Sequence, residues 1–502
     1  MSTFETVPEL VARAAAQFGD LPAVFDGRRR LTFAELAVAV SRAAGSYGTL
    51  GPPGATDLLS ARNSVGLVVA WLGAIDAGLI PAAVNPDLTI SELRYIGGEL
   101  EPCCVAVDAP EGAGSELAVE YGVPLVQVAQ IEGAAPGKAR PIDPLKTAAI
   151  VYTSGTTSRP KGVQVRHAAY TETGRSFPSW VGLRGEDVLW ACLPLFHINA
   201  QAYSLMTALA HGMPLAVTDR FHATTFWADA AELGVTAVNV IGAMLTFLEA
   251  QPQSSFRESR LRLIYAAPAP APEVRRRLQE RFGVFITGGY GMSENTFGCA
   301  ESPTSRDKAG SIGRPRQPVA ATFENQLKIV TPDGRDAATG EPGELHFRNP
   351  VLTPGYWRAP EITSAALVDG WLKTGDLGVR DDDGDISLVG RSKEMIRRRG
   401  ENISPAEVED ALAVHPAVAA VAVFGIPSPS TEEDVVAAVV LRPGFSAIAS
   451  ELQAFARERL APFKVPTEIA FVADLPLTAT ARVARDRLRN EFLAARVKLT
   501  ES

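Results

Sequence analysis

Short runs of β-branched and small apolar residues alternate with helical stretches through the N-terminal half of the chain. The helical stretch 8–18 repeats apolar residues at helical spacing, and Thr32 with Glu35 forms a capping box that opens a helix over 33–44. Strands that alternate with helices favour parallel sheets covered by helices. The sequence therefore predicts an α/β fold, with strands over 104–107, 148–153, 214–218, 237–241 and 263–266.

The pattern changes after Ser311, where Gly and Pro become frequent and short strands such as 326–330 and 343–347 are separated by turns. This pattern of short strands and frequent turns predicts an antiparallel, barrel-like β section, with a hairpin turn at 381–384. The last part of the chain has its own pattern of helix 405–414, strands 418–424 and 435–441, and helix 449–460. We therefore expect a large N-terminal domain of stacked α/β sheets with a barrel-like section (1–390), and a small, mobile α+β C-terminal domain (391–502).

Composition narrows the function classes. The net charge is −9, so no basic field attracts nucleic acid or an anionic membrane. The apolar stretch 65–84 contains Asp76 and Pro81, which favours a buried helix and strand over a membrane span. The four cysteines show no metal-binding spacing, and the N-terminus shows no signal-peptide pattern. These features predict a cytoplasmic protein and leave its oligomeric state open.

The strand 148–152 leads directly into a loop of small and hydroxylated residues that ends at Lys161. Small residues allow backbone N–H groups to approach an anion, hydroxyls add further donors, and a lysine places a compact charge on phosphate oxygens. The Walker pattern is absent. The loop therefore predicts a phosphate site of another kind.

The string YTSGTTSRPKGV at 152–163 resembles the signature loop of the adenylate-forming superfamily, which includes acyl-CoA synthetases, peptide-synthetase adenylation domains and luciferases. Further motifs follow in the order typical of that superfamily: PLFH at 194–197, YGMSE at 290–294, GSIGRP at 310–315, LKTGDL at 372–377 and GRSKEMI at 390–396. The stretches TSGTTSRPKGV, FHINAQ and MIRRRGENISPAEVE resemble crotonobetaine/carnitine-CoA ligases in particular. The resemblance implies an AMP-forming ligase that activates a small acid with ATP and Mg²⁺ and transfers it to an acceptor, with the CoA thiol favoured.

The resemblance also implies roles for individual residues. Lys161, His197, Glu294 and Arg482 are the candidate catalytic residues, and Glu294 with Thr153 would bind the metal, since carboxylate and hydroxyl oxygens suit Mg²⁺. Asp376 would accept the ribose hydroxyls, and Arg391 would add donors. The implied nucleotide site comprises Thr153, Ser154, Gly155, Thr156, Thr157, Lys161, Ala266, Ala267, Pro268, Gly289, Tyr290, Gly291, Met292, Ser293, Asp376 and Arg391.

The acid and the acceptor would use a second set of residues. His197, Asn199, Gln201 and Met244 are expected to line the acid pocket. Lys393 matches the hinge about which the family rotates its C-terminal domain between the two half-reactions. In the second orientation, Gly400 and Glu401 are expected to approach the pantetheine of CoA.

The chain departs from the family near its C-terminus. The family motif Pro-x-Thr-x-x-Gly-Lys is present as PLTATAR, so Ala481 replaces the glycine and Arg482 replaces the lysine that bridges the acid and the α-phosphate. Arginine and lysine differ in shape and hydration. Three alternatives stay open: Arg482 does the lysine's work, the C-terminal domain contributes little to adenylation, or the acid is unusual. Alternative functions are a carrier-protein thiol or an amine as acceptor, diazotisation of an aromatic amine with nitrite, and a non-catalytic nucleotide-binding relic.

Overall fold

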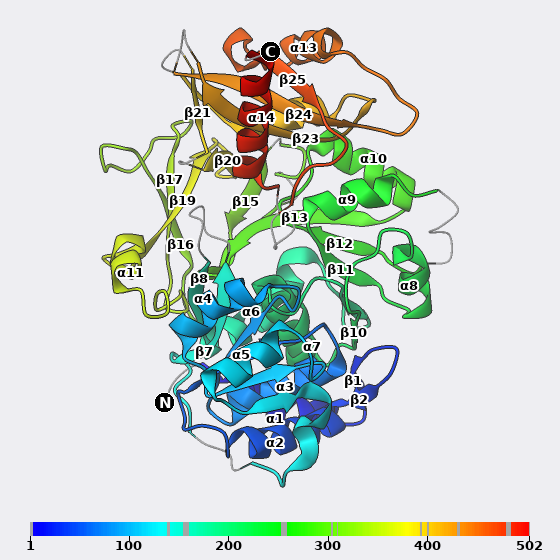
Figure 1. Ribbon diagram of the computed structural model, residues 1–502, viewed down its shortest axis with the longest axis vertical. Coiled ribbons are helices and arrows are strands. Elements are labelled where there is room, and N and C mark those ends of the chain that lie inside the picture. The colour runs from blue at the N-terminus through cyan, green and yellow to red at the C-terminus, as the bar shows by residue number, and fades with distance from the viewer. Residues whose placement is uncertain are drawn as a thin grey trace.

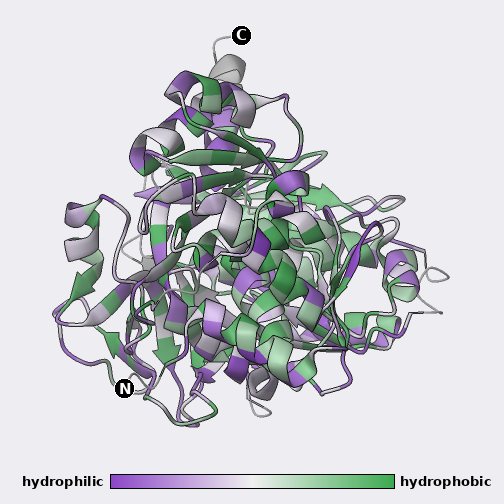
Figure 2. Cartoon of the chain, turned by 90° about the horizontal axis from the view of Figure 1, so that it is seen from below, coloured by the Kyte–Doolittle hydropathy of each residue, from purple (hydrophilic) through white to green (hydrophobic). Residues whose placement is uncertain are grey.

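The computed structural model describes residues 4–137, 141–153, 160–252, 259–302, 305–308, 310–391, 394–398, 401–428, 432–477 and 483–500. The two α/β parts of the N-terminal domain stack on each other, and the C-terminal part lies at the opposite end of the molecule from α1–α3 (Figure 1). Hydrophobic residues concentrate inside this body, while hydrophilic ones dominate its periphery (Figure 2).

The smaller of the two main sheets has six strands in the order β6-β5-β3-β4-β7-β8. Its first five strands are parallel, and β8 closes the edge antiparallel to β7. The strands are β3 (Thr56–Ser60), β4 (Ile80–Val84), β5 (Cys104–Val107), β6 (Leu125–Gln127), β7 (Thr147–Thr153) and β8 (Lys161–Arg166). The helices of this part are α1 (Val7–Phe18), α2 (Phe33–Tyr47), α3 (Val65–Asp76), α4 (Ile90–Leu100) and α5 (Ala113–Tyr121).

The larger sheet joins a parallel half to an antiparallel half in one hydrogen-bonded path. The parallel half contains β1 (Pro22–Phe25), β10 (Leu215–Val217), β9 (Leu189–Ala191), β11 (Ala237–Val240), β12 (Leu263–Ala266) and β13 (Phe285–Met292), with β2 (Arg30–Thr32) antiparallel at its edge. The antiparallel half begins at β14 (Asn295–Ala300), earlier than the expected start after Ser311, because β14 already pairs antiparallel with β13. It continues through β15 (Ser311–Pro315), β20 (Ile386–Arg391), β19 (Trp371–Arg380), β17 (Gly343–Arg348) and β16 (Gln326–Val330), with the short β18 (Leu367–Val368) beside β19.

Helix α6 (His167–Val181) and helix α7 (Met206–His211), which directly follows the π-helical turn η2 (Asn199–Leu205), belong to the main core, together with α8 (Phe226–Glu232) and α9 (Gly242–Glu249). The outer helices are α10 (Pro272–Phe282) and α11 (Pro360–Ala366). The stretch 65–84 forms the buried helix α3 and strand β4, as predicted. Nearly every residue of α3 is buried, and fully burying one such apolar side chain stabilises the fold by about 1.5–3 kcal/mol.

The C-terminal part has two hydrophobic cores of its own, formed by residues between 396 and 493. Its three-stranded sheet is β23 (Val418–Pro427), β24 (Glu433–Leu441) and β25 (Glu468–Phe471), beside the hairpin β21 (Ile396–Arg398) and β22 (Glu401–Ile403). The helices are α12 (Pro405–Ala413), α13 (Ala449–Arg457) and α14 (Arg485–Thr500). The predicted fold class, a large N-terminal domain followed by a small α+β domain, is confirmed. None of the helices in the described ranges is long and apolar enough to cross a bilayer.

Candidate active site

Lys161 stands at the start of β8, directly across the β7–β8 ladder from Thr153. The edge of β8 is covered by the segment around Tyr356: the N–H of Trp357 donates to the carbonyl of Gly162 at 2.7 Å. This pairing places Lys161 Nζ 5.6 Å from the centroid of the Tyr356 ring. The end of the predicted phosphate loop is therefore held against an aromatic face that favours a cation.

Tyr356 links Lys161 to Glu294. Its hydroxyl donates to Glu294 Oε1 at 2.8 Å, and burial, with the carboxylate nearby, raises the pKa of this hydroxyl, so it stays a donor. Glu294 is only 8% exposed and sits in the turn between β13 and β14, where its carbonyl accepts from Thr353 N–H at 2.9 Å. The phosphate-loop lysine and the YGMSE glutamate, far apart in sequence, are thus brought together around one tyrosine.

The donor set at this point fits magnesium. Mg²⁺ usually takes one or two carboxylates, with substrate phosphates and water completing its shell. Glu294 offers a nearly buried carboxylate, and Thr153, the last residue of β7, offers a hydroxyl at the start of the predicted phosphate loop. These two residues would hold the ion, which would neutralise charge on the phosphates.

Tyr290 of β13 and Asp376 of β19 form a second pair. The Tyr290 hydroxyl donates to Asp376 Oδ2 at 2.6 Å, and both residues are less than a tenth exposed. The Tyr290 ring stacks on Phe347 with centroids 6.1 Å apart. Burial, followed by the charge of Asp376, raises the pKa of Tyr290, so the phenol stays protonated. Asp376 lies opposite Arg391 in the β19–β20 ladder.

The two faces of β13 have different surroundings, because successive residues of a strand point to opposite sides. Tyr290 points toward Asp376, whereas a Cβ on Gly289 would collide with the guanidinium of Arg316, and one on Gly291 with the hydroxyl of Tyr203. Met292 and Ser293 complete this end of the strand, while Ala266 at the end of the neighbouring β12 is followed by Ala267 and Pro268. The strand therefore separates a predicted nucleotide side from a second, polar interior.

The predicted acid-pocket residues have different environments. His197 lies just before η2, half-buried, with its ring 4.5 Å from that of Phe196. Asn199 Oδ1 is buried and has no hydrogen-bond partner in the described part of the chain. Gln201 is 1% exposed and its amide is used inside the protein, donating to the carbonyl of Leu195 and accepting from Tyr170. Met244 packs in the main core.

Several predicted site residues lie outside the described residues. These are Ser154, Gly155, Thr156 and Thr157 of the phosphate loop, Lys393, Gly400 and Arg482, together with the side chains of Arg391 and Glu401.

Tyr356 and Arg316 are the site residues that the sequence reasoning missed. Tyr356 lies in a segment rich in Gly and Pro, and its contact with Lys161 depends on the pairing of that segment with β8. The only local signal is the pair of aromatic residues, Tyr356 and Trp357, between Gly355 and Arg358.

Comparison with known proteins identifies the family of the chain. The family of AMP-binding enzymes matches residues 11–357, and the AMP-binding enzyme C-terminal domain matches residues 407–482. A sulfoacetate–CoA ligase of Cupriavidus necator is 32% identical over 506 residues, covering 97% of this chain and 98% of that protein. A crotonobetaine/carnitine–CoA ligase of Shigella flexneri is 30% identical over 488 residues, covering 92% of this chain and 93% of that protein.

The solved structure of an anthranilate–CoA ligase in complex with anthranoyl-AMP shares the fold, with a TM-score of 0.91 at 24% identity and 99% coverage of both chains. The resemblance to the adenylate-forming superfamily, including its crotonobetaine/carnitine–CoA ligase members, is confirmed. The chain belongs to the family of AMP-binding enzymes and is an AMP-forming ligase.

Proposed function

We propose that this enzyme adenylates a small carboxylic acid with Mg-ATP and transfers the acyl group to the thiol of CoA. In the first step a carboxylate oxygen forms a bond to the α-phosphorus and the bond to pyrophosphate breaks. In the second step the thiol sulfur, having lost its proton, forms a bond to the acyl carbon and AMP leaves with that oxygen. The observation that carries the proposal is the meeting of three motifs at the end of β13, through the Lys161–Tyr356–Glu294 and Tyr290–Asp376 contacts.

Each contact suits one part of ATP. Lys161 and the loop that precedes it would stabilise the negative charge on the departing pyrophosphate, an electrostatic role that a preorganised donor fills well. Glu294 and Thr153 would hold Mg²⁺. Asp376, fixed by the Tyr290 hydroxyl, would accept the two ribose hydroxyls, while Ala266, Ala267 and Pro268 would border the adenine.

The acid would lie on the other side of β13, beside η2. We assign to it two polar groups: His197, just before this turn, and Asn199 Oδ1, which has no hydrogen-bond partner among the described residues. We assign Gln201 a packing role, because both ends of its amide already bond inside the protein. Met244 would contribute only apolar contact, since it packs in the main core.

We also propose that the C-terminal domain rotates between the two half-reactions. We place the boundary at 390–391 and the hinge at Lys393, with Gly400 and Glu401 approaching CoA in the second orientation. In the orientation described, Arg442 of the C-terminal domain contacts Glu249 of α9 at 3.0 Å, and Glu249 is also held by Arg277 at 2.6 Å. A few polar contacts of this kind suit a domain that must move, because interfaces between mobile domains are small and polar.

Arg482 supports a second candidate, in which the acid that the enzyme activates is unusual, as in diazotisation of an aromatic amine with nitrite. The sequence carries arginine where the family uses lysine during adenylation. Under the CoA proposal, Arg482→Lys keeps or raises pyrophosphate release, and Arg482→Ala lowers it about ten- to a thousandfold, the range for a positioned charge. Unchanged rates in both variants would favour the unusual-acid alternative and make nitrite with an aromatic amine the next test.

The deciding experiment measures pyrophosphate release for a panel of small acids, with and without CoA. The proposal predicts acid-dependent release, about one equivalent per enzyme without CoA and continuous turnover with CoA, together with a thioester product. Turnover that needs an amine or a carrier-protein thiol, and not CoA, would replace CoA by that acceptor. Release that no acid stimulates would refute adenylation.

A further inference from the structure

A positively charged side chain is buried in the polar interior on the glycine face of β13. Arg316, directly after β15, is 2% exposed. Among the described residues, no carboxylate forms an ion pair with it, although the buried arginine Arg275 nearby is paired with Glu301. A buried charge without a counter-ion is costly, so the protein retains one only where something else compensates it.

The neighbours of Arg316 are aromatic and neutral. Its Nη1 donates to the Tyr203 hydroxyl at 3.1 Å, and its Nη2 donates to the Tyr265 hydroxyl. Its guanidinium carbon lies 4.9 Å from the centroid of the Trp180 ring and 5.3 Å from that of Tyr203. These contacts favour a cation and fix its position, but they carry no negative charge.

Two donors in this cluster are uncommitted. Arg316 Nε is buried and has no acceptor in the described ranges. The Tyr203 hydroxyl donates to the carbonyl of Thr296 at 2.7 Å, whereas the Tyr265 hydroxyl, which accepts from Arg316, has no such acceptor among the residues that the structure describes. The cluster therefore presents one positive charge and two free N–H or O–H donors, which is the complement of an anionic oxygen group.

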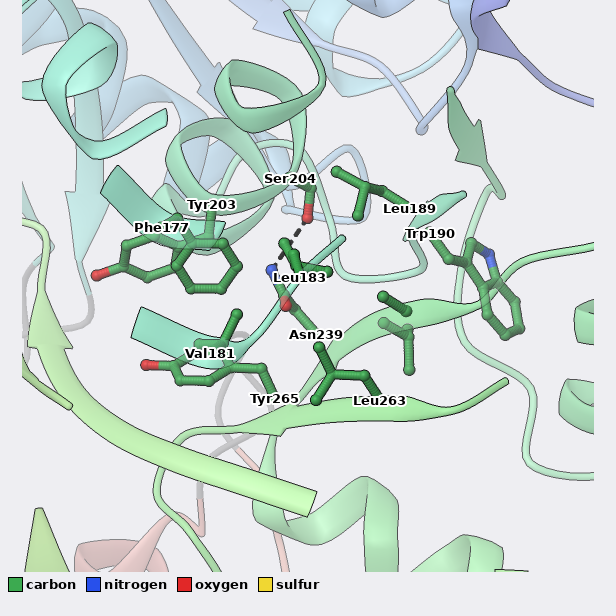
Figure 3. Close-up of a pocket in the computed structure, with 12 residues that line it drawn as sticks. Phe177, Val181, Leu183, Leu189, Trp190, Tyr203, Ser204, Asn239, Leu263 and Tyr265 are labelled. Atoms are coloured by element: carbon green, nitrogen blue, oxygen red, sulfur yellow. Dashed lines mark hydrogen bonds between the residues drawn. The ribbon is translucent and has the colours of Figure 1, made fainter. Parts of the chain in front are cut away.

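The space behind the tyrosines is filled. Their rings, with Phe177, line one side of an internal cavity of only about 10 Å³, which has room for a single water molecule. Figure 3 shows the two hydroxyls on the same side, pointing away from Ser204 and Asn239. A long acyl chain could not extend into this region.

The cluster is also close to the proposed reaction centre. Arg316 and the Tyr203 hydroxyl border Gly289 and Gly291, and three residues of extended chain, from Gly291 to Glu294, span at most about 10 Å. Tyr203 is four residues beyond Asn199 in η2, so the same turn carries both groups. The cluster and the proposed reaction centre therefore lie within the length of a short molecule of each other.

We infer that Arg316, with Tyr265, binds a second anionic group of the acid, so that the substrate is a short dianion whose carboxylate is adenylated and whose other end is a carboxylate or sulfonate. This inference rests on the proposed function. Arg316 thereby becomes a specificity-determining residue, since a site built around a buried charge discriminates strongly against an acid that leaves that charge unpaired.

The test compares acids that differ only in the second charge. Malonate and sulfoacetate are assayed for pyrophosphate release against propionate and methylsulfonylacetate, which have a similar size and one negative charge. The wild-type enzyme should prefer the dianions by at least about a hundredfold in kcat/KM. Activity with both dianions, or with only one, supports the inference and identifies the second group as carboxylate, sulfonate or either.

Arg316→Met keeps the length of the side chain and removes the charge. It should lower kcat/KM for the dianion at least about a hundredfold, leave the monoanions unchanged or improved, and leave the KM for ATP within about twofold. Arg316→Lys should restore part of the dianion activity. Tyr265→Phe is a smaller change that keeps the ring. It should lower kcat/KM for the dianions about tenfold and leave kcat/KM for the monoanions unchanged. This variant provides the test if Arg316→Met fails to fold.

Other results would overturn the inference. A wild-type preference for monoanions, or an equal loss with all acids in Arg316→Met at an unchanged melting temperature, would make Arg316 a structural residue held by its aromatic neighbours. In that case the proposed adenylation would survive. If none of these four acids released pyrophosphate but another acid of the panel did, the inference would fail and the proposed adenylation would survive. If no acid of the panel released pyrophosphate, the proposed function would fail, and the inference with it.

Discussion

Asp376→Ala and Tyr290→Phe break the same hydrogen bond and remove different partners, so together they test the ribose assignment. The bond is 2.6 Å long and both residues are nearly buried. Asp376→Ala also removes the proposed charged acceptor of the ribose hydroxyls, and a hydrogen bond to a charged group contributes about 1.5–3 kcal/mol. ATP should therefore bind about ten- to 150-fold more weakly.

Tyr290→Phe is the matched control. It keeps the carboxylate and the ring that stacks on Phe347, so the affinity for ATP should change by less than about threefold. Both variants remove one hydrogen-bond partner of a buried polar group, which costs about 1–3 kcal/mol of folding stability. Their melting temperatures should therefore fall by similar amounts, whereas their ATP affinities should differ.

Calorimetry with Mg-ATP in the absence of acid measures the affinity, and a thermal melt without ligand measures the stability. If both variants bound ATP equally weakly, the hydrogen bond between the two side chains, rather than the carboxylate itself, would matter for ATP binding. Unchanged ATP affinity in Asp376→Ala would remove this residue from the nucleotide site.

Three further predictions concern the loop, the hinge and the core. Lys161→Ala should slow adenylation on the order of a hundredfold, whereas Lys328→Ala, which removes another lysine stacked on an aromatic ring, should leave the rate of pyrophosphate release within about twofold. Lys393→Pro fixes φ at the proposed hinge and should impair one half-reaction, measured in single turnovers, much more than the other; equal losses would argue against alternation. Burial raises the pKa of Asp57 to about 7, so the neutral acid stabilises the fold at low pH and this stability is lost as the pH rises from about 4 through 7. In Asp57→Asn, the melting temperature should fall less between pH 5 and 8.5 than in the wild-type protein. If it falls by the same amount, other titrating groups cause the fall.

The elements that follow local rules were predictable from the sequence. Strands β5, β12 and β16 begin and end at the predicted residues, because short apolar runs bounded by helical patterns or by turns define them. The predicted end of α2 was three residues short, since the helix continues to Tyr47, whose fully buried side chain draws an extra turn into the core. The order of strands in the large sheet is set by contacts distant in sequence, such as β1 beside β10, and no local pattern encodes it.

The site residues likewise divide into those that local motifs identify and those that depend on contacts distant in sequence. Lys161, Glu294 and Asp376 were identified from motifs, and the structure gives each a partner or neighbour in a shared region. Tyr356 and Arg316 were missed because their significance lies in distant partners, a strand edge in one case and two tyrosines from different elements in the other. Residues two apart in a helical turn do not share a face, which is why Asn199 and Gln201 differ in their surroundings although they are neighbours in the FHINAQ motif.

The most direct test of adenylation follows one oxygen atom. The enzyme is supplied with Mg-ATP, CoA and an accepted acid whose carboxylate carries ¹⁸O, and the AMP and pyrophosphate are analysed by mass spectrometry. Attack of the carboxylate on the α-phosphorus predicts one ¹⁸O in each AMP formed and none in the pyrophosphate. AMP without ¹⁸O, or label in a phosphate released with ADP, would contradict the account.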